Sequence, residues 1–214
     1  DNVQIPAFFP ENSKIKSDFI TNYKNIEKLD EQIGVIINQL KEDDLYDNTI
    51  IFFFSDHGGP FPRYKRSIYE TGLRVPMIAK WINDKNRGNN YQLVSFVDFA
   101  PTVLDAANLK REFPFEGVSF FKKNNRSYVY AASDRFDEAT DIRRSISDGK
   151  FKLIYNGDTS SPVYKSVGYR KQMQTMQVLD SLEKNNELNN FFSDWFSKRK
   201  NRFELYEVSN DYYE

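Results

Sequence analysis

The chain has 214 residues, of which 39% are hydrophobic and 16% aromatic, enough apolar material for one large domain or a domain with a small appendage. Its 30 basic and 31 acidic residues give a net charge of −1, which excludes a general attraction to nucleic acid or to an anionic membrane. The lack of cysteine excludes disulfides and thiolate chemistry within these residues, and no apolar run is long enough to span a membrane.

The first predicted element is a long helix over residues 13–42. Apolar residues recur there at steps of three and four and form one stripe: Ile15, Phe19, Tyr23, Ile26, Leu29, Ile33, Ile37 and Leu40. The run from Thr49 to Phe54 is continuous, apolar and β-forming, which is typical of a strand buried on both faces, as in a parallel sheet. A helix followed by a buried strand indicates α/β architecture, in which ligand sites lie at the C-terminal ends of the strands.

Further along, strands are predicted over residues 75–81 and 93–97, and a short helix begins near Asp98 and runs to about Leu109. The character of the sequence changes over residues 111–127. The remaining predicted elements are strands at 128–132, 145–147, 151–155 and 203–208, helices at about 170–184 and 187–197, and a hairpin turn at Asp148-Gly149. We therefore expect an α/β part over residues 1–115 and a small α+β subdomain with an antiparallel sheet over 116–214.

Charged residues gather directly after the strand predicted at 49–54. Asp56 and His57, the one histidine of the chain, can both face a cation, although such a pair can equally be a turn cap and a loop side chain. Arg63, Lys65 and Arg66 follow within ten residues of Asp56. Three cations beside acidic and imidazole groups suit a phosphate or sulfate ester, and the alternative is a solvated basic loop.

Residues 49–76 as a whole resemble the second signature region of type I sulfatases, in the alkaline-phosphatase superfamily. That region has an apolar strand, then Ser-Asp-(Asn or His)-Gly, then Lys-x-x-x-Tyr-Glu-x-Gly-x-Arg-Val-Pro. The chain matches it at the same spacing with Ser55-Asp56-His57-Gly58 and with Lys65, Tyr69, Glu70, Gly72, Arg74, Val75 and Pro76.

The resemblance covers nearly the whole chain, but only about the second half of a family member. Residues 24–40, 97–104 and 204–211 resemble other segments of the family. Residues 62–66, 134–138 and 152–156 look most like the branch that includes heparan N-sulfatase. The resemblance implies the second half of an alkaline-phosphatase-like mixed sheet flanked by helices, followed by the small C-terminal subdomain.

The resemblance also implies roles for single residues. Asp56 and His57 would complete a divalent-cation site, usually for Ca²⁺, with Zn²⁺ or Mn²⁺ as the alternatives that an imidazole ligand suits better. Lys65 is the expected catalytic residue, which would bind a sulfate oxygen and offset charge that develops in the transition state. Arg63 is a second candidate for substrate binding. We expect Asp56, His57 and Lys65 to face one cavity.

The family nucleophile is a formylglycine made within a Cys/Ser-x-Pro-Ser/Ala-Arg motif, which this sequence lacks: Ser160-Ser161-Pro162 has no arginine after it. We therefore expect the chain to be part of a longer sulfatase and inactive alone. The resemblance implies a sulfated small molecule or glycan as substrate and a periplasmic, secreted or lysosome-like compartment. Two alternatives stay open: a metal-dependent phosphodiesterase or phosphatase of the same superfamily, or a non-catalytic binding module on the sulfatase scaffold.

Overall fold

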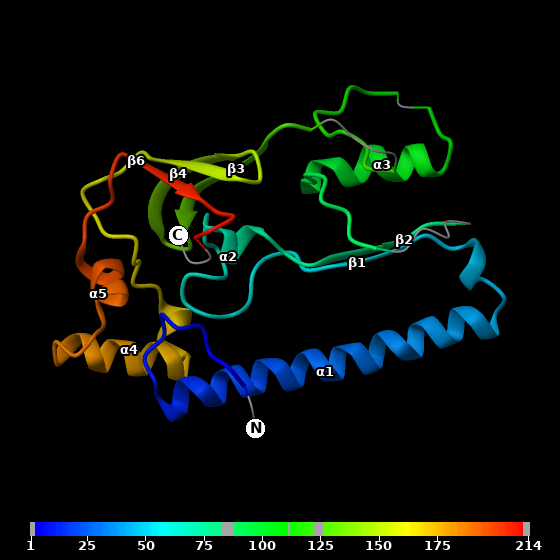
Figure 1. The fold of residues 1–214 in the computed structure, drawn as a ribbon. Helices are drawn as coiled ribbons and strands as arrows, with labels where there is room; N and C mark the ends of the chain where they lie inside the picture. The colour runs from blue at the N-terminus through cyan, green and yellow to red at the C-terminus, as the bar shows by residue number, and fades with distance from the viewer. Residues whose placement is uncertain (1–2, 83–87, 111, 122–125, 212–214) are drawn as a thin grey trace.

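The computed structural model describes residues 3–82, 88–110, 112–121 and 126–211. It is an α/β fold with a two-stranded and a four-stranded sheet and helices around them, in agreement with the predicted fold class (Figure 1). The elements in chain order are α1 (Ser13–Glu42), η1 (Tyr46–Asn48), β1 (Ile51–Phe54), α2 (Glu70–Leu73), β2 (Met77–Lys80), η2 (Phe96–Asp98), α3 (Phe99–Ala106), β3 (Val129–Phe136), β4 (Ala139–Ser147), β5 (Phe151–Asn156), η3 (Gly168–Gln172), α4 (Gln174–Lys184), α5 (Asn190–Ser197) and β6 (Phe203–Glu207).

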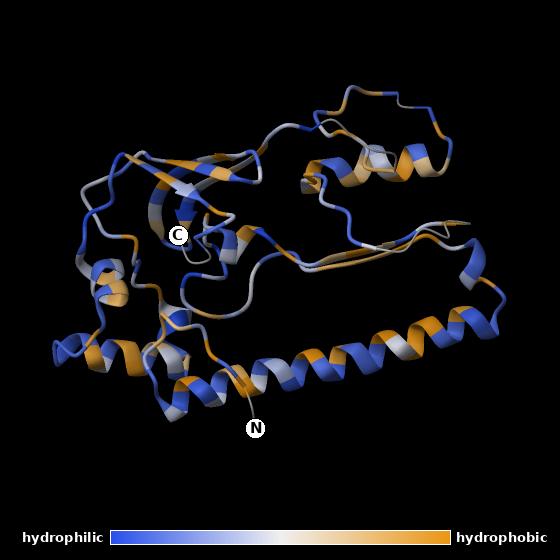
Figure 2. Ribbon diagram, in the orientation of Figure 1, coloured by the Kyte–Doolittle hydropathy of each residue, from blue (hydrophilic) through white to orange (hydrophobic). Residues whose placement is uncertain are grey.

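Helix α1 has the predicted bounds. It begins where the Asn12 side chain accepts a hydrogen bond from the Lys14 backbone N–H at 2.9 Å. Its apolar stripe, visible in Figure 2, is buried only in the first turns, at Ile15 and Phe19, because only these turns pack against α4 and the aromatic core. The rest of the stripe is less buried, and Tyr23, Ile26 and Leu29 are exposed. No helix in the described ranges has the length and apolar character that a bilayer span requires.

The small sheet differs from its prediction. β1 pairs with β2 in an antiparallel register, Phe54 opposite Met77, because the chain folds back on itself between these two strands. Phe53 and Phe54 are exposed, so the predicted strand buried on both faces, as in a parallel sheet, is wrong for the described residues. Figure 1 shows α1 below and α3 above this sheet. Phe52 packs edge-to-face on Trp81 at 5.2 Å between ring centroids, so this tryptophan has a packing role.

The structure has no strand at residues 93–97, where one is predicted. The Asp98 carboxylate accepts a hydrogen bond from the Ser95 N–H at 2.8 Å and bends this segment into the 3₁₀ turn η2. The helix predicted after it is confirmed as α3, which begins at Phe99 and ends three residues before the predicted end at Leu109.

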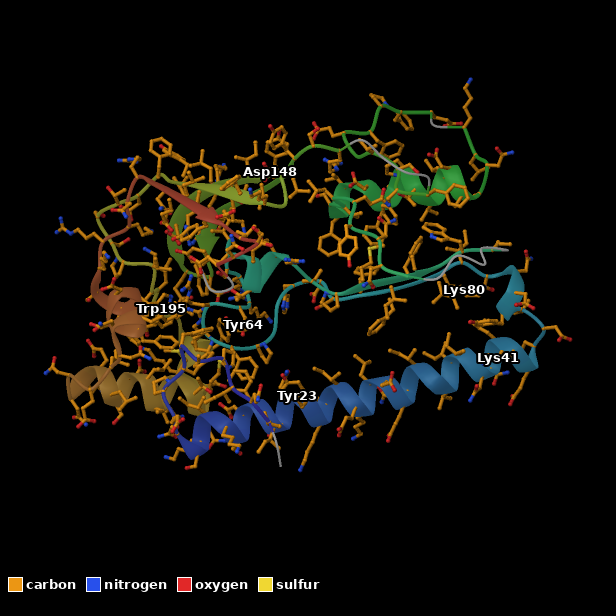
Figure 3. All side chains as sticks on the ribbon, viewed as in Figure 1. Tyr23, Lys41, Tyr64, Lys80, Asp148 and Trp195 are labelled. Atoms are coloured by element: carbon orange, nitrogen blue, oxygen red, sulfur yellow. The ribbon has the colours of Figure 1, made fainter. Side chains whose placement is uncertain are left out.

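The four-stranded sheet has the order β3-β4-β5-β6, with every pair antiparallel, as predicted. The hairpin turn is also confirmed: Asp148, labelled in Figure 3, accepts hydrogen bonds from the N–H groups of Lys150 and Phe151, and Gly149 has φ +87°. The sheet is unusual in burying polar side chains and exposing apolar ones. Lys152 is buried beside exposed Leu153 on β5.

The main core joins the two ends of the chain. Phe9 and Phe19 pack with Phe192 and Trp195 of α5, which gives Trp195 a packing role (Figure 3). Phe61, from the segment between β1 and β2, stacks on Phe19 with 3.8 Å between ring centroids. This core therefore fixes the segment that carries the predicted site residues.

Candidate active site

The predicted site lies on residues 55–74, which we call the site loop. The loop leaves β1 and doubles back to β2. The Ser55 N–H donates to the Pro76 carbonyl at 3.3 Å, and the Gly58 N–H donates to the Gly72 carbonyl at 3.0 Å. A third backbone bond, from Lys65 N–H to the Gly59 carbonyl at 3.0 Å, closes the first half of the loop. The two halves of the sequence motif therefore touch through their backbones.

Two glycines permit this contact. A Cβ on Gly58 would lie 1.9 Å from the Thr71 carbonyl oxygen. A Cβ on Gly72 would lie 2.3 Å from the carbonyl oxygen of Ser67 and 2.6 Å from that of Tyr64. Any side chain at either position would force two backbone segments apart, so the glycines are required by close approach and not by a positive φ.

Asp56 and His57 lie together at the end of β1. The His57 Nδ1 atom is 2.7 Å from the Gly58 carbonyl, which can only accept, so in the neutral ring Nδ1 carries the hydrogen and Nε2 keeps its lone pair. Nε2 is 3.6 Å from the Asp56 Oδ2 atom, and the Asp56 side chain is 83% exposed. A carboxylate and an imidazole nitrogen are thus presented side by side. The described residues contain no group of three or more such ligands around one point.

Lys65 follows on the same loop and is half-buried. Its backbone bond to Gly59 places it beside the turn that carries Asp56 and His57. Within the described ranges, its amine takes part in no hydrogen bond or ion pair. The expectation that these three side chains face one cavity stays a prediction.

Arg63 and Arg66 adopt left-handed backbone conformations on either side of Lys65, with φ of +65° and +64°. The Arg63 guanidinium is buried between two aromatic rings, 4.2 Å from the centroid of Tyr69 and 4.5 Å from that of Phe191. The Arg66 guanidinium is paired with Asp137. Both arginines therefore point toward the C-terminal part of the fold.

A buried clamp, which the sequence did not indicate, holds the second half of the loop. The Tyr69 hydroxyl donates to the Glu204 carboxylate at 3.1 Å and accepts from Arg143 at 3.1 Å, and burial raises the pKa of this phenol. The Lys152 amine donates to the Glu70 carboxylate at 2.7 Å. Alternating polar residues on β4 and β5 were the available signal, but such a pattern is normally taken for a solvent-facing side of a sheet.

The sequence of this chain matches two protein-family models. Residues 4–109 match the family model for sulfatases, and residues 59–203 match the model for the C-terminal part of N-sulphoglucosamine sulphohydrolase. An ulvan-active sulfatase from Formosa agariphila is 41% identical over 214 residues, which is 98% of this chain and 36% of the relative. The N-sulphoglucosamine sulphohydrolase of Homo sapiens is 26% identical over 106 residues, which is 49% of this chain and 21% of that protein.

Among solved structures, BT4656 in complex with its substrate D-glucosamine-2-N,6-O-disulfate aligns with a TM-score of 0.52 and 22% identity, over 78% of this chain and 40% of that one. This likeness shows a shared fold. The chain spans between about a fifth and two fifths of the length of these relatives. The chain belongs to the sulfatase family of the alkaline-phosphatase-like superfamily, and most of it matches the C-terminal part of N-sulphoglucosamine sulphohydrolase.

Proposed function

We propose that this chain is part of a sulfatase that hydrolyses sulfate esters or N-sulfates of a sulfated glycan or a small sulfated molecule. The observation that carries the proposal is the closed site loop, in which Gly58 and Gly72 bring together the halves of the motif that bear Asp56, His57 and Lys65. The relatives named for action on ulvan, on N-sulphoglucosamine and on a glucosamine disulfate support a sulfated saccharide as substrate.

Asp56 and the Nε2 atom of His57 are proposed to hold a divalent cation. They supply two donors, and a calcium ion takes six to eight, so any further carboxylate ligands would come from outside the described residues. The family resemblance favours Ca²⁺, whereas the imidazole donor suits Zn²⁺ or Mn²⁺. When bound, such an ion would polarise a sulfate oxygen and stabilise negative charge.

Lys65 is proposed to stabilise the transition state. Cleavage of a sulfur–oxygen bond moves negative charge onto the sulfate and leaving-group oxygens. A fixed ammonium beside them gains more in the transition state than in the ground state, and only such a difference raises kcat. Because the 214 residues contain no Cys/Ser-x-Pro-x-Arg motif, the nucleophile is proposed to lie on another segment of the protein.

The test uses the full-length protein, with sulfate release from D-glucosamine-2-N,6-O-disulfate measured by ion chromatography. Lys65→Ala should lower kcat by about 100- to 1000-fold with little change in KM. A change in KM alone, or intact activity, would contradict the role given to Lys65. Release of phosphate from a phosphate ester in place of sulfate would favour the phosphatase alternative. The 214-residue chain alone should release no sulfate.

A metal titration tests the proposed cation site. Asp56→Ala should weaken cation affinity by tenfold or more, on the order seen when ligation is disturbed, so that added cation restores part of the activity. The matched control is Asp47→Ala, which removes an exposed carboxylate on η1. If Asp56→Ala behaves like Asp47→Ala in the titration, the carboxylate of Asp56 does not bind the ion.

A further inference from the structure

Lys65 is flanked by two unusual backbone positions. Six non-glycine residues have a positive φ in the described ranges, and four of them are Asp or Asn, whose short side chains can compensate for this conformation by local hydrogen bonds. The other two are Arg63 and Arg66. An arginine has no such local compensation, so contacts with the rest of the protein must hold these two residues in place.

The two arginines occupy the same position in two consecutive turns. The Tyr64 N–H donates to the Phe61 carbonyl at 3.1 Å and closes the first turn, in which Arg63 is the third residue. The Ser67 N–H donates to the Tyr64 carbonyl at 3.0 Å and closes the second, in which Arg66 is the third residue and Lys65 the second. A positive φ at the third position of a turn normally selects glycine or asparagine. Arginine at both positions therefore calls for a reason beyond the turn itself.

The contacts of Arg63 fix its side chain and its backbone. The residue is 8% exposed, and its guanidinium lies between the rings of Tyr69, on the same loop, and Phe191 of α5. Phe191 packs in turn against the main aromatic core. The Arg63 carbonyl accepts a hydrogen bond from the Thr71 hydroxyl at 2.5 Å. The first turn is thus held both by the core and by the second half of the site loop.

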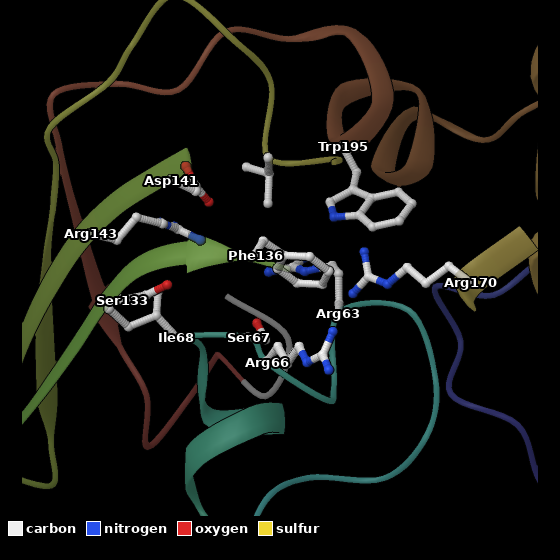
Figure 4. A pocket seen from close by; sticks show the side chains of 11 residues that line it. Arg63, Arg66, Ser67, Ile68, Ser133, Phe136, Asp141, Arg143, Arg170 and Trp195 are labelled. Atoms are coloured by element: carbon white, nitrogen blue, oxygen red, sulfur yellow. The ribbon is translucent and has the colours of Figure 1, made fainter. Parts of the chain in front are cut away.

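Arg66 is held by the C-terminal part of the fold. Its guanidinium is paired with Asp137, in the turn between β3 and β4, and lies 4.8 Å from the centroid of the Tyr169 ring of η3. Figure 4 shows Arg66 beside Phe136, in the space between the site loop and β3. Asp137 lies 71 residues further along the chain. Tertiary contacts, and not the local sequence, therefore set the conformation of the second turn.

The position of the Lys65 side chain depends on these two turns. A change of φ at either arginine would rotate the backbone that carries the lysine and move its amine. The hydrogen bond from the Lys65 N–H to the Gly59 carbonyl, at 3.0 Å, ties the same backbone to the turn that bears Asp56 and His57. Displacing a reacting group by about 1 Å can cost about 100-fold in rate. A catalytic ammonium on this segment therefore needs the turns to be fixed.

We propose that Arg63 and Arg66 are positioning residues for Lys65: their side-chain contacts fix the two turns, and the turns direct the ammonium toward the sulfate. The inference rests on the proposed function. It gives Arg63 a role through the backbone, in place of the substrate contact that its charge suggests. Glycine at either position would allow the turn to form but would not fix it, which explains why a long side chain with distant partners occupies each one.

The first test compares Arg66→Ala with Arg66→Gly in the full-length protein, with the sulfate-release assay on D-glucosamine-2-N,6-O-disulfate. Both changes remove the guanidinium, but only glycine adopts a positive φ without cost. Arg66→Ala should lower kcat about tenfold or more, and Arg66→Gly should keep a kcat about fivefold higher than that, with KM nearly constant in both. The pair Arg63→Ala and Arg63→Gly should give the same ranking. Equal kcat values within each pair, or a loss confined to KM as a substrate contact predicts, overturn the proposal.

A double-mutant cycle shows whether Arg66 acts through Lys65. When Arg66→Ala is added to Lys65→Ala, kcat should fall by less than about twofold further, because the group that Arg66 positions is already absent. The values refer to the folded fraction of each variant, measured by circular dichroism. Effects of the two changes that multiply would show that Arg66 acts independently of the lysine and would overturn the positioning role.

Asp137→Gly guards against loop variants that fail to fold. It removes the partner of Arg66 from outside the loop, and glycine accepts the φ of +51° at this position. We expect kcat to fall about threefold or more with KM unchanged. The matched control is Asp134→Ala, which breaks an exposed ion pair with Arg144 on the same hairpin and should leave kcat unchanged. Equal kcat values for these two variants overturn the proposal.

The same measurements separate this inference from the proposed function. Sulfate release that requires Lys65 but is insensitive to Arg66→Ala and Asp137→Gly contradicts the positioning role alone. Sulfate release that is unaffected by Lys65→Ala, or a full-length protein that releases no sulfate, contradicts the proposed function and the positioning role with it. A loss of kcat in the order Lys65→Ala, Arg66→Ala, Arg66→Gly, with constant KM, supports both.

Discussion

The two ends of the site loop are held in opposite ways. At the first end, the Asp56 side chain is 83% exposed, and the contacts of His57 are with its immediate neighbours in the chain. At the second end, Tyr69 is 3% exposed and its hydroxyl contacts Arg143 and Glu204, which lie 74 and 135 residues further along. One end presents polar groups, and the other anchors the loop to the four-stranded sheet.

The residues of the sequence motif therefore have two physical roles: some present side chains to a ligand, and others anchor the loop. Residues near β1 have side chains available for a ligand. Tyr69 and Glu70 belong to the same motif, but they hold the loop to β4, β5 and β6. The C-terminal sheet therefore fixes the position of Lys65, although it contributes no residue to the Asp56–His57 pair. A substitution at the anchored end should lower stability, and one at the presented end should change ligand binding.

Gly72→Ala should have the largest effect on stability, because it disrupts the close packing of backbone within the anchored part of the loop. The new Cβ would meet two backbone carbonyl oxygens, at 2.3 and 2.6 Å, which cannot rotate away. We expect a loss of about 3 kcal/mol in the free energy of unfolding, measured by urea denaturation. The control is Gly34→Ala on α1, where nothing lies within 4 Å; this change should stabilise the protein by about 0.5–1 kcal/mol. Equal results for both glycines would contradict the close approach.

Lys152→Met tests the anchored end alone. Lys152 is 1% exposed, and the change keeps its volume while leaving the Glu70 carboxylate without this amine. We expect a loss of about 2 kcal/mol, which reflects a largely desolvated acceptor that has lost a charged partner. A double-mutant cycle with Glu70→Gln, measured by urea denaturation, should give a coupling energy of about 1 kcal/mol or more. Additive effects would show that the two side chains do not act together.

Local signals explain what could be predicted of the fold. The regular apolar spacing predicted α1 with its bounds, and Asp148-Gly149 predicted the hairpin, because these features act within a few residues. The apolar run of β1 does not encode its partner, so neither the antiparallel pairing with β2 nor the exposure of Phe54 could be predicted. The apolar pattern predicts a strand at 93–97, because that pattern carries no sign of the hydrogen bond that the Asp98 side chain makes.

For the candidate site too, only the features that depend on neighbouring residues could be predicted. The placement of Asp56 and His57 follows from their position directly after β1, and the structure confirms that they lie together. The clamp on Tyr69 and Glu70 could not be predicted, because charged residues such as Arg143 and Lys152 within a strand are normally expected on its solvent-facing side. Here Arg143 and Lys152 lie inside, and Lys152 shares the buried face of β5 with Ile154. Only the partners, distant in the chain, reveal which face is buried.

Lys150→Met should have the smallest effect and completes the comparison. Lys150 is two residues before Lys152 on the same hairpin, and its amine lies 3.5 Å from the Glu207 carboxylate. That pair is exposed, at 62% and 40% of the two side chains, so water and salt screen the attraction. We expect a change in the free energy of unfolding of no more than about 0.5 kcal/mol, which shrinks further when the urea denaturation is repeated in 0.5 M NaCl, a salt concentration at which the Debye length is about 4 Å. The loss in Lys152→Met should stay nearly constant in the same salt, because its partner lies inside the protein. If both lysines lost equal stability with equal salt dependence, burial would not be what separates the anchored end of the loop from the surface.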